Sequence, residues 1–150
     1  MDGRKMASMW RGSSVPLMRV SHKCHLMWVV EGMKGRAMLV NDIYALRAYG
    51  VGWFAQLALW FRAYDKAGSF LLLCDCGGYN GWVHHALRLG VRDFFIESRA
   101  DSMRSFIESY GGAVFSVEGV GRRYHFRDGF DDSVREDFVA WLRREGLAVS

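Results

Sequence analysis

The segment ALRAYGVGWFAQLALWFRAYDKAGSFLLLCD, residues 45–75, contains the pattern that decides the predicted fold. Between residues 53 and 64 the apolar side chains recur every three or four positions, the spacing of a helix with one buried face, and Gly68 follows where a helix commonly ends. Residues 69–75 then form an apolar, β-rich run. The segment therefore predicts an amphipathic helix that leads into a buried strand.

Two β-rich runs precede this helix, at residues 25–31 (HLMWVVE) and 36–46 (RAMLVNDIYAL). The linker GMKG between them has two glycines, which suit a tight turn. We therefore expect an antiparallel hairpin here. Order is expected to begin near Leu17, after a flexible arm of Gly, Ser and Met at residues 1–14.

Two strand-and-helix units follow the first helix. In each, an apolar strand leads through a polar turn to a short helix that ends at glycine, and a shift of 22 residues superimposes Asp75 on Glu97. Alternating runs on either side of GVG, residues 119–121, predict a second hairpin. Residues 131–146 predict a C-terminal helix with an apolar stripe. The expected fold class is α/β or α+β, with a mixed central sheet flanked by helices.

Composition bounds the class of protein. A chain of 150 residues with 51% hydrophobic residues is expected to fold as a single domain, residues 15–150. The net charge of +4 favours anionic ligands such as phosphates, nucleotides or nucleic acid, and a solvated basic surface explains it equally well. Three cysteines, the lack of a secretory signal and the lack of a long apolar run predict a cytoplasmic protein without a membrane span. The sequence does not decide the oligomeric state, and an oligomer is possible.

The stretch before the first helix places Arg47, Gly50 and Gly52 where a strand is expected to hand over to a helix. A helix N-terminus exposes unpaired N–H groups and a partial positive charge, and glycines leave room for an anion to reach them. Arg47 adds a charge that suits a phosphate. The alternative is a tight turn with a solvated arginine. The phosphate-binding-loop pattern lacks its lysine, since Trp53 follows Gly52. The dinucleotide pattern tolerates Ala55 in place of its third glycine, but here it would follow an antiparallel hairpin and lacks the acidic residue expected about 20 residues on, with Asp75 the nearest.

The hexapeptide RAYGVG, residues 47–52, resembles the R/Q-x-x-G-x-G/A signature of the GNAT superfamily of N-acetyltransferases. Residues 93–126 are similar to that family's later half and to acetyltransferase-like internal virion proteins of tailed phages. The resemblance implies that acetyl-CoA or another acyl-CoA rests its pyrophosphate on the signature loop. It gives cofactor-binding roles to Arg47, Tyr49, Gly50, Val51, Gly52 and Trp53. A rival register takes residues 69–75 as the signature strand and CGGYNG, residues 76–81, as the loop, which restores the later element order but loses the arginine.

Amine attack on a thioester requires a base for the amine and an acid for the leaving thiolate. Asp42 and Glu31, on the two strands of the first expected hairpin, are the candidate bases. The family's usual tyrosine acid is missing from its expected place in this sequence. Tyr110, Tyr79 and His85 are the candidate replacements.

The cysteines and histidines offer the atoms of a zinc site. The relevant residues are Cys24, His25, Cys74, Cys76, His84 and His85. The C-x-C spacing is not the usual C-x-x-C knuckle, and free cysteine is among the most buried residue types. We therefore expect core packing and no metal.

The sequence thus predicts an N-acyltransferase that moves an acetyl or related acyl group from acyl-CoA to an amine, with an amine on a modified nucleotide or DNA as an attractive acceptor. The alternative is a catalytically inactive protein of the same fold, either a phage virion component or an inhibitor of a host protein. The short segment before the signature and the missing tyrosine favour this alternative.

Overall fold

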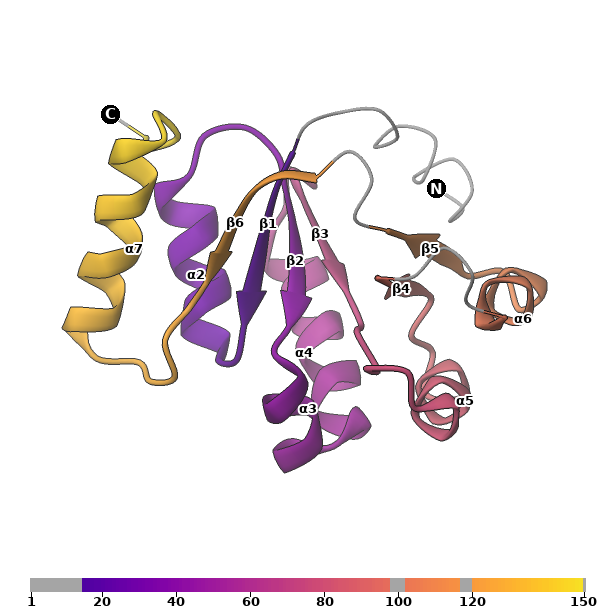
Figure 1. Ribbon diagram of the computed structural model, residues 1–150. Coiled ribbons are helices and arrows are strands. Elements are labelled where there is room, and N and C mark those ends of the chain that lie inside the picture. Colours follow the sequence, from indigo (N-terminus) through magenta and orange to yellow (C-terminus); the bar gives the residue numbers. More distant parts are fainter. Residues whose placement is uncertain (1–14, 98–101, 117–119, 150) are drawn as a thin grey trace.

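The computed structural model describes residues 15–97, 102–116 and 120–149. It shows an α/β fold with a central parallel sheet flanked by helices (Figure 1), which confirms the predicted fold class and its C-terminal helix. The arm predicted at residues 1–14 lies outside the described residues. The elements in chain order are β1 (Val15–Val20), α2 (Lys23–Gly32), β2 (Ala37–Asn41), α3 (Ile43–Tyr49), α4 (Val51–Tyr64), β3 (Phe70–Leu73), α5 (Asn80–Arg88), β4 (Asp93–Phe95), α6 (Met103–Ser109), β5 (Ala113–Phe115), β6 (Val120–His125) and α7 (Asp132–Arg144).

The strands form one parallel array. Four of them pair in the order β3-β2-β1-β6, and β4 and β5 form a second pair. All of these pairs are parallel. An isolated parallel bridge between Cys74 and Phe94 places β4 beside β3. The strands therefore follow the order β6-β1-β2-β3-β4-β5 across the molecule. The arrows of β1, β2, β3 and β6 point the same way in Figure 1, and the parallel pairing puts the carboxyl ends of β4 and β5 at the same edge of the sheet.

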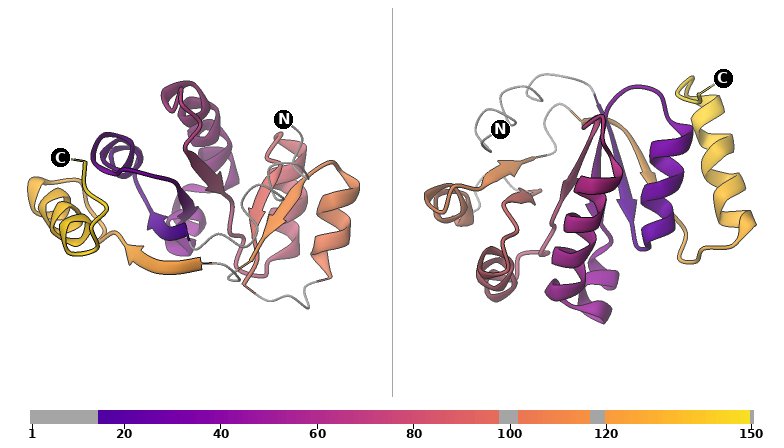
Figure 2. Two further views of the ribbon diagram at one scale, coloured as in Figure 1. Left: turned by 90° about the horizontal axis from the view of Figure 1, so that it is seen from above. Right: turned by 180° about the vertical axis from the view of Figure 1, so that it is seen from behind.

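One face of the sheet is covered by helices. Consecutive parallel strands are joined by right-handed crossovers, which place successive connecting helices on the same face when strand order follows chain order. Helices α2 and α4 lie behind the sheet in Figure 1 and in front of it in the right-hand view of Figure 2. The core on this face joins Met18 and Leu39 of the sheet to Val29 of α2, Phe61 of α4 and Phe138 of α7.

The opposite face of the sheet is also apolar. The strand residues that alternate with the first core, such as Leu17, Met38 and Leu71, are buried together with Phe95 and Phe115 of β4 and β5. Burial on both faces is typical of parallel sheets. Since β1 and β5 contribute to one cluster although β2, β3 and β4 lie between them, the sheet curves around that cluster.

The predicted hairpins are wrong. Residues 25–31 belong to α2, because His25, Leu26 and Val29 recur at helical spacing and form its buried face. The strand paired with β2 is instead β1, and the pairing is parallel. The second hairpin is also absent among the described strands, since β6 crosses the molecule to pair with β1. An antiparallel hairpin was the simplest interpretation of two neighbouring β-rich runs, and it overlooked the helical period inside the first of them.

The remaining local predictions are close to the structure. The amphipathic helix appears as α4, and the two strand-and-helix units appear as β3-α5 and β4-α6. The C-terminal helix α7 begins after Asp131, whose carboxylate accepts hydrogen bonds from the N–H groups of Ser133 and Val134. Its buried residues Val134, Phe138 and Trp141 recur every three or four positions and fix which face packs on the sheet.

Candidate functional site

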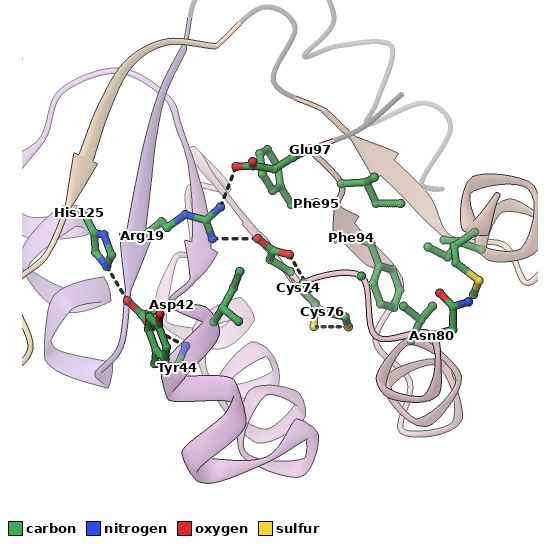
Figure 3. Close-up of a pocket in the computed structure, with 18 residues that line it drawn as sticks. Arg19, Asp42, Tyr44, Cys74, Cys76, Asn80, Phe94, Phe95, Glu97 and His125 are labelled. Carbon is green, nitrogen blue, oxygen red and sulfur yellow. Dashed lines mark hydrogen bonds and ion pairs between the residues drawn. The ribbon is translucent and has the colours of Figure 1, made fainter. Parts of the chain in front are cut away.

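Polar side chains gather where the strands end. In parallel α/β sheets, ligands commonly bind outside the carboxyl ends of the strands. Here Arg19 lies near the end of β1, Asp42 follows β2, Asp75 follows β3, Glu97 follows β4 and His125 ends β6. All five side chains line one cavity of about 480 Å³ (Figure 3). The sheet topology thus brings together groups that are far apart in the sequence.

Arg19 connects three strand ends. Its guanidinium donates to Oδ2 of Asp75 at 2.9 Å, to Oε1 of Glu97 at 3.1 Å and to the backbone carbonyl of Asn41 at 3.1 Å. The guanidinium also lies 5.6 Å from the centre of the Phe95 ring, within the range of a cation–π contact. The side chain of Arg19 is only 16% exposed, so its charge is held in a fixed position rather than solvated.

Asn41 holds the β2 and β3 ends together. Its side chain is fully buried, and its Oδ1 accepts the N–H of Asp75 at 2.7 Å while its Nδ2 donates to the Asp75 carbonyl at 3.0 Å. The amide therefore continues the pairing of the two strands beyond their last backbone hydrogen bonds. Asp75 in turn accepts the N–H of Gly77 at 2.8 Å and so fixes the start of the next loop.

Asp42 and His125 form a hydrogen-bonded pair at the other side of the cavity. Nε2 of His125 lies 2.5 Å from Oδ2 of Asp42. Asp42 is the N-cap of α3, and its Oδ1 accepts the N–H groups of Tyr44 and Ala45. Burial alone would raise the pKa of Asp42, but the hydrogen bonds from His125 and from these N–H groups outweigh burial and lower its pKa below the ordinary value. The carboxylate is thus kept ionised beside an exposed imidazole.

The cavity has an apolar half opposite this pair. Phe94 of β4, Val83 of α5 and Ile107 of α6 are buried and line it together with Met103 and Ile96. Nearby, the thiols of Cys74 and Cys76 lie 3.7 Å apart, both buried. The site therefore offers polar groups at the ends of β1, β2, β3, β4 and β6, and an apolar wall formed by Phe94 of β4 and by residues of α5 and α6 (Figure 3).

A glycine loop lies between β3 and α5, at the edge of the same cavity. Gly77 and Gly78 have positive φ angles of 61° and 85°, which favour glycine, and both line the cavity together with Asn80 at the start of α5. Tyr79, the N-cap of α5, makes no side-chain hydrogen bond to the helix. The rival register of the signature thus has the predicted strand, loop and helix.

The first register does not have them. The strand β2 ends at Asn41, and residues 43–49 form α3, so Gly50 lies between two helices with a φ of 88° rather than between a strand and a helix. Val51, Gly52 and Trp53 belong to the first turn of α4, and Val51 is buried. The helical period of Ile43, Leu46 and Tyr49 was hidden by the β-rich residues before it.

Two of the side chains predicted around that turn, those of Arg47 and Tyr49, lie at the surface. Arg47 donates to the hydroxyl of Tyr79 at 3.3 Å, and its guanidinium lies 5.8 Å from the centre of the Tyr44 ring. Tyr49 is 55% exposed and contacts Trp53, with ring centres 5.4 Å apart. These contacts place Arg47 next to the glycine loop through Tyr79, although Arg47 itself does not line the cavity.

Of the five predicted catalytic residues, only Asp42 lines the cavity. Glu31 is on α2, where it accepts a hydrogen bond from the Tyr64 hydroxyl at 3.1 Å. His85 is exposed on α5, and Tyr110 is 57% exposed at the end of α6. The structure therefore separates Asp42 from its predicted partners and gives it His125 instead.

The cysteines and histidines of the zinc hypothesis do not form a metal site among the described residues. Within the described ranges no cluster of three or more His, Cys, Asp or Glu side chains is arranged to hold a metal ion. His25 is fully buried, with Nδ1 accepting the N–H of Ser21 and Nε2 bonded to the Gly129 carbonyl at 2.7 Å.

In the part of the chain that the structure describes, no helix is both long and apolar enough to span a membrane.

Comparison with protein-family models found no match for this chain, and comparison with curated proteins found none either.

Sequence reasoning missed Arg19, Asn41 and His125 as site residues. The sequence contained part of the information needed to find the site. The shift of 22 residues superimposes Asp75 and Glu97, which each follow a strand and each bond Arg19. A search for polar residues at the end of every buried strand would have found Asn41 as well, since it is the last residue of β2. His125 needed the knowledge that β6 returns to β1.

Proposed function

We propose that the protein is an enzyme that carries out general acid–base chemistry on a small molecule bound at the carboxyl edge of its sheet. The observation that carries this proposal is the His125–Asp42 pair in the wall of a cavity that has a polar and an apolar half. The imidazole side chain is 59% exposed, so a ligand can reach it, whereas the carboxylate is only 15% exposed. Such a pair is a common way to position a proton-transfer group.

The roles of the two residues follow from the hydrogen bond between them. When the imidazole is neutral and Nε2–H donates to the Asp42 carboxylate, Nδ1 is left with a lone pair that can accept a proton from the ligand. The ionised carboxylate then stabilises the imidazolium that forms. Asp42 is itself anchored by the first N–H groups of α3, so it can orient His125 without moving.

The charge of the cavity indicates the ligand's chemistry. Asp42, Asp75 and Glu97 provide three carboxylates, and among the described residues Arg19 is the one arginine or lysine that lines the cavity with them. Since Arg19 is already paired to Asp75 and Glu97, the polar half presents mainly hydrogen-bond acceptors. A ligand with an amine or hydroxyl head and an apolar body of modest size fits both halves.

Turnover of a small-molecule extract tests this function. The purified chain is incubated with the metabolite fraction of bacterial cells, and mass spectrometry follows which compounds are consumed. We expect at least one hydroxyl- or amine-bearing compound to be consumed by the wild type and about 10²-fold more slowly by His125→Gln. Asp42→Asn should also be slower. The matched control is His85→Gln, an exposed histidine outside the cavity, which should act as the wild type does.

Two results would contradict the proposal. In the first, His125→Gln consumes the compound at the wild-type rate. In the second, the wild type consumes nothing and no compound in the extract raises its melting temperature.

Acyl transfer is a second candidate, and the Gly77–Gly78 loop favours it. This loop follows a strand, precedes a helix and lines the cavity, as the rival signature register requires. An acyl-CoA pyrophosphate on the loop would bring its thioester toward an amine near His125. The acceptor would then be an amine, carried on a modified nucleotide or on DNA as the sequence predicts. The reaction would take place in the cytoplasm. A chain that binds the same molecules without turnover is the corresponding non-enzymatic form.

Titration calorimetry with acetyl-CoA separates these candidates. Binding that is lost in Gly78→Val but kept in Gly52→Val would support acyl transfer in the rival register, because Gly52 lies on the exposed side of α4 with no atom within 4 Å of an added Cβ. Circular dichroism checks that Gly78→Val still folds, since its φ is positive. No heat at millimolar acetyl-CoA would exclude acyl transfer and leave the acid–base proposal standing.

A further inference from the structure

A second cavity lies on the other side of the His125–Asp42 pair. It has a volume of about 610 Å³, and Asp42, Tyr44 and His125 line both cavities. The new cavity, which we call the α3 groove, continues along α3 and along the residues that follow β6. The proton-transfer pair of the proposed function therefore stands between two separate spaces, and only one of them is used by the ligand described above.

The floor and sides of the α3 groove suit a flat ring. Tyr44, Ala45, Ala48 and Tyr49 line it from one face of α3, because residues at these spacings are neighbours on a helix surface. The two alanines leave a low floor, and the tyrosines beside them are 74% and 55% exposed. Phe126 lies on the opposite side. Exposed tyrosine rings beside a low floor can stack on a planar ligand at little conformational cost.

The hydroxyl of Ser21, which lines the groove, lacks a hydrogen-bond partner among the described residues. This residue directly follows β1, lines the groove and is only 7% exposed. Its Oγ is buried and has no hydrogen-bond partner within the described residues. A buried hydroxyl without a partner costs free energy, so such groups are normally satisfied by protein, water or ligand. The backbone N–H of Ser21 is already used by His25, which leaves the hydroxyl as the free group.

The ionic side chains that line the groove, Asp42, Arg127 and Asp128, each have a partner. Arg127 is bonded to Asp137 at 2.6 Å, and Asp128 lies 3.1 Å from Nε2 of His22. Neither is therefore available as an isolated charge for a strongly anionic or cationic ligand. The groove selects for planarity and for one hydrogen-bonding substituent rather than for charge.

We infer that the α3 groove binds a second reactant, an uncharged aromatic or heterocyclic ring that carries a hydroxyl, amino or carbonyl group bonded to Ser21. The role as a reactant rests on the proposed function, because it uses His125 as the group that both ligands reach. The binding site itself does not depend on turnover. In this arrangement Nδ1 of His125 takes a proton from one ligand and returns it to the other, so the imidazole ends the exchange neutral, as it began.

Fragment binding followed by ¹H–¹⁵N NMR tests the inference on the full chain. The probes are phenol, toluene, which lacks the hydroxyl, and cyclohexanol, which lacks the planar ring. We expect phenol to shift the amide signals of Ala45 and Ala48 and to bind about fivefold more tightly than either of the other two. Ser21→Ala should weaken phenol binding to the level of toluene while toluene binding stays unchanged. Ser109→Ala, on exposed α6, is the control for loss of a surface hydroxyl.

A variant that fills the groove provides an independent check. Ala48 is exposed, so Ala48→Trp can occupy the groove without disturbing the core, and it should abolish the phenol shifts. Gln56→Trp on the exposed side of α4 is its matched control. The inference is overturned if phenol shifts no groove signal at millimolar concentration, or if Ser21→Ala binds phenol as the wild type does. If phenol binds to a chain that shows no turnover, the binding site is supported and only the role of its ligand as a reactant is overturned.

Discussion

Nη1 of Arg19 lies 2.9 Å from Oδ2 of Asp75, although the two residues are 56 positions apart. The pair forms because β1 and β3 lie on either side of β2, so their carboxyl ends meet at the same edge. Both side chains are largely buried, at 16% and 7% exposure. A buried ion pair of this kind is costly to break from one side, since the remaining charge has no solvent to stabilise it.

Arg19→Met is therefore expected to lower the free energy of unfolding by about 3 kcal/mol, because it leaves the Asp75 carboxylate buried without its partner. Asp75→Asn should also destabilise. The double variant should recover part of the loss, which gives a coupling energy of about 1 kcal/mol or more. Urea denaturation of the four proteins measures this cycle. Strict additivity of the two single effects would show that the ion pair contributes nothing beyond its separate residues.

Two glycines are expected to respond in opposite directions to alanine. Gly52→Ala should raise the free energy of unfolding by about 0.5–1 kcal/mol, because Gly52 lies within α4 and an added Cβ meets nothing within 4 Å. Gly112→Ala should lower it by about 1–3 kcal/mol, since the Cβ would lie 2.7 Å from the Arg92 carbonyl and 2.6 Å from the Ile107 side chain. Thermal or urea unfolding measures both. A loss of stability in Gly52→Ala would mean that this glycine serves a conformation other than the helix seen here.

The strong helical and strand patterns were predictable from the sequence. The helix α4, the units β3-α5 and β4-α6 and the helix α7 follow from apolar spacing and from glycines at helix ends, which act over a few residues. The parallel pairing was not predictable in this way. Whether β1 pairs with β2 in parallel or antiparallel depends on the element between them, and α2 was interpreted as a strand because Trp28, Val29 and Val30 also favour β structure.

The candidate site was only partly predictable for the same reason. Asp42 was a candidate base because it lies on the expected signature strand, and Asp75 and Glu97 were aligned with each other by the shift of 22 residues. Their partners Arg19 and His125 come from the first and last strands, which become neighbours only through the β1-β6 pairing. No local pattern carries that information. The glycines at residues 50 and 52 were expected between a strand and a helix, but they lie at a helix–helix junction, which also requires a glycine with positive φ, here Gly50.

His25 is expected to make the fold less stable in mild acid. Burial lowers the pKa of His25 from 6.5 to about 4, and the neighbouring His22 acts in the same direction, whereas the bond to the Gly129 carbonyl and the charge of Asp128 act against it. As the pH falls, His25 is protonated near pH 6.5 in the unfolded chain but only near pH 4 in the folded chain. The free energy of unfolding should therefore fall by about 3 kcal/mol as the pH is lowered through this range.

Urea denaturation at several pH values measures this contribution. His25→Gln should show a smaller loss between pH 6.5 and pH 4 than the wild type, whatever its stability at neutral pH. His85→Gln is the matched control, because His85 is exposed, and its pH dependence should equal that of the wild type. Equal slopes for His25→Gln and the wild type would assign the acid sensitivity to other groups.

The last prediction concerns the thiols beside the cavity. The hydrogen bond with Cys76, followed by burial, raises the pKa of Cys74 well above its ordinary value, and burial also raises the pKa of the half-buried Cys24. Alkylation requires the thiolate, so both effects slow the reaction. With iodoacetamide at pH 8, peptide mass spectrometry should find Cys24 modified first and Cys74 only when urea unfolds the chain. In Cys24→Ser the native protein should be nearly inert and the unfolded protein fully reactive at Cys74 and Cys76. Modification of native Cys74 at the rate of Cys24 would show that the cavity opens far enough to expose the end of β3 without global unfolding.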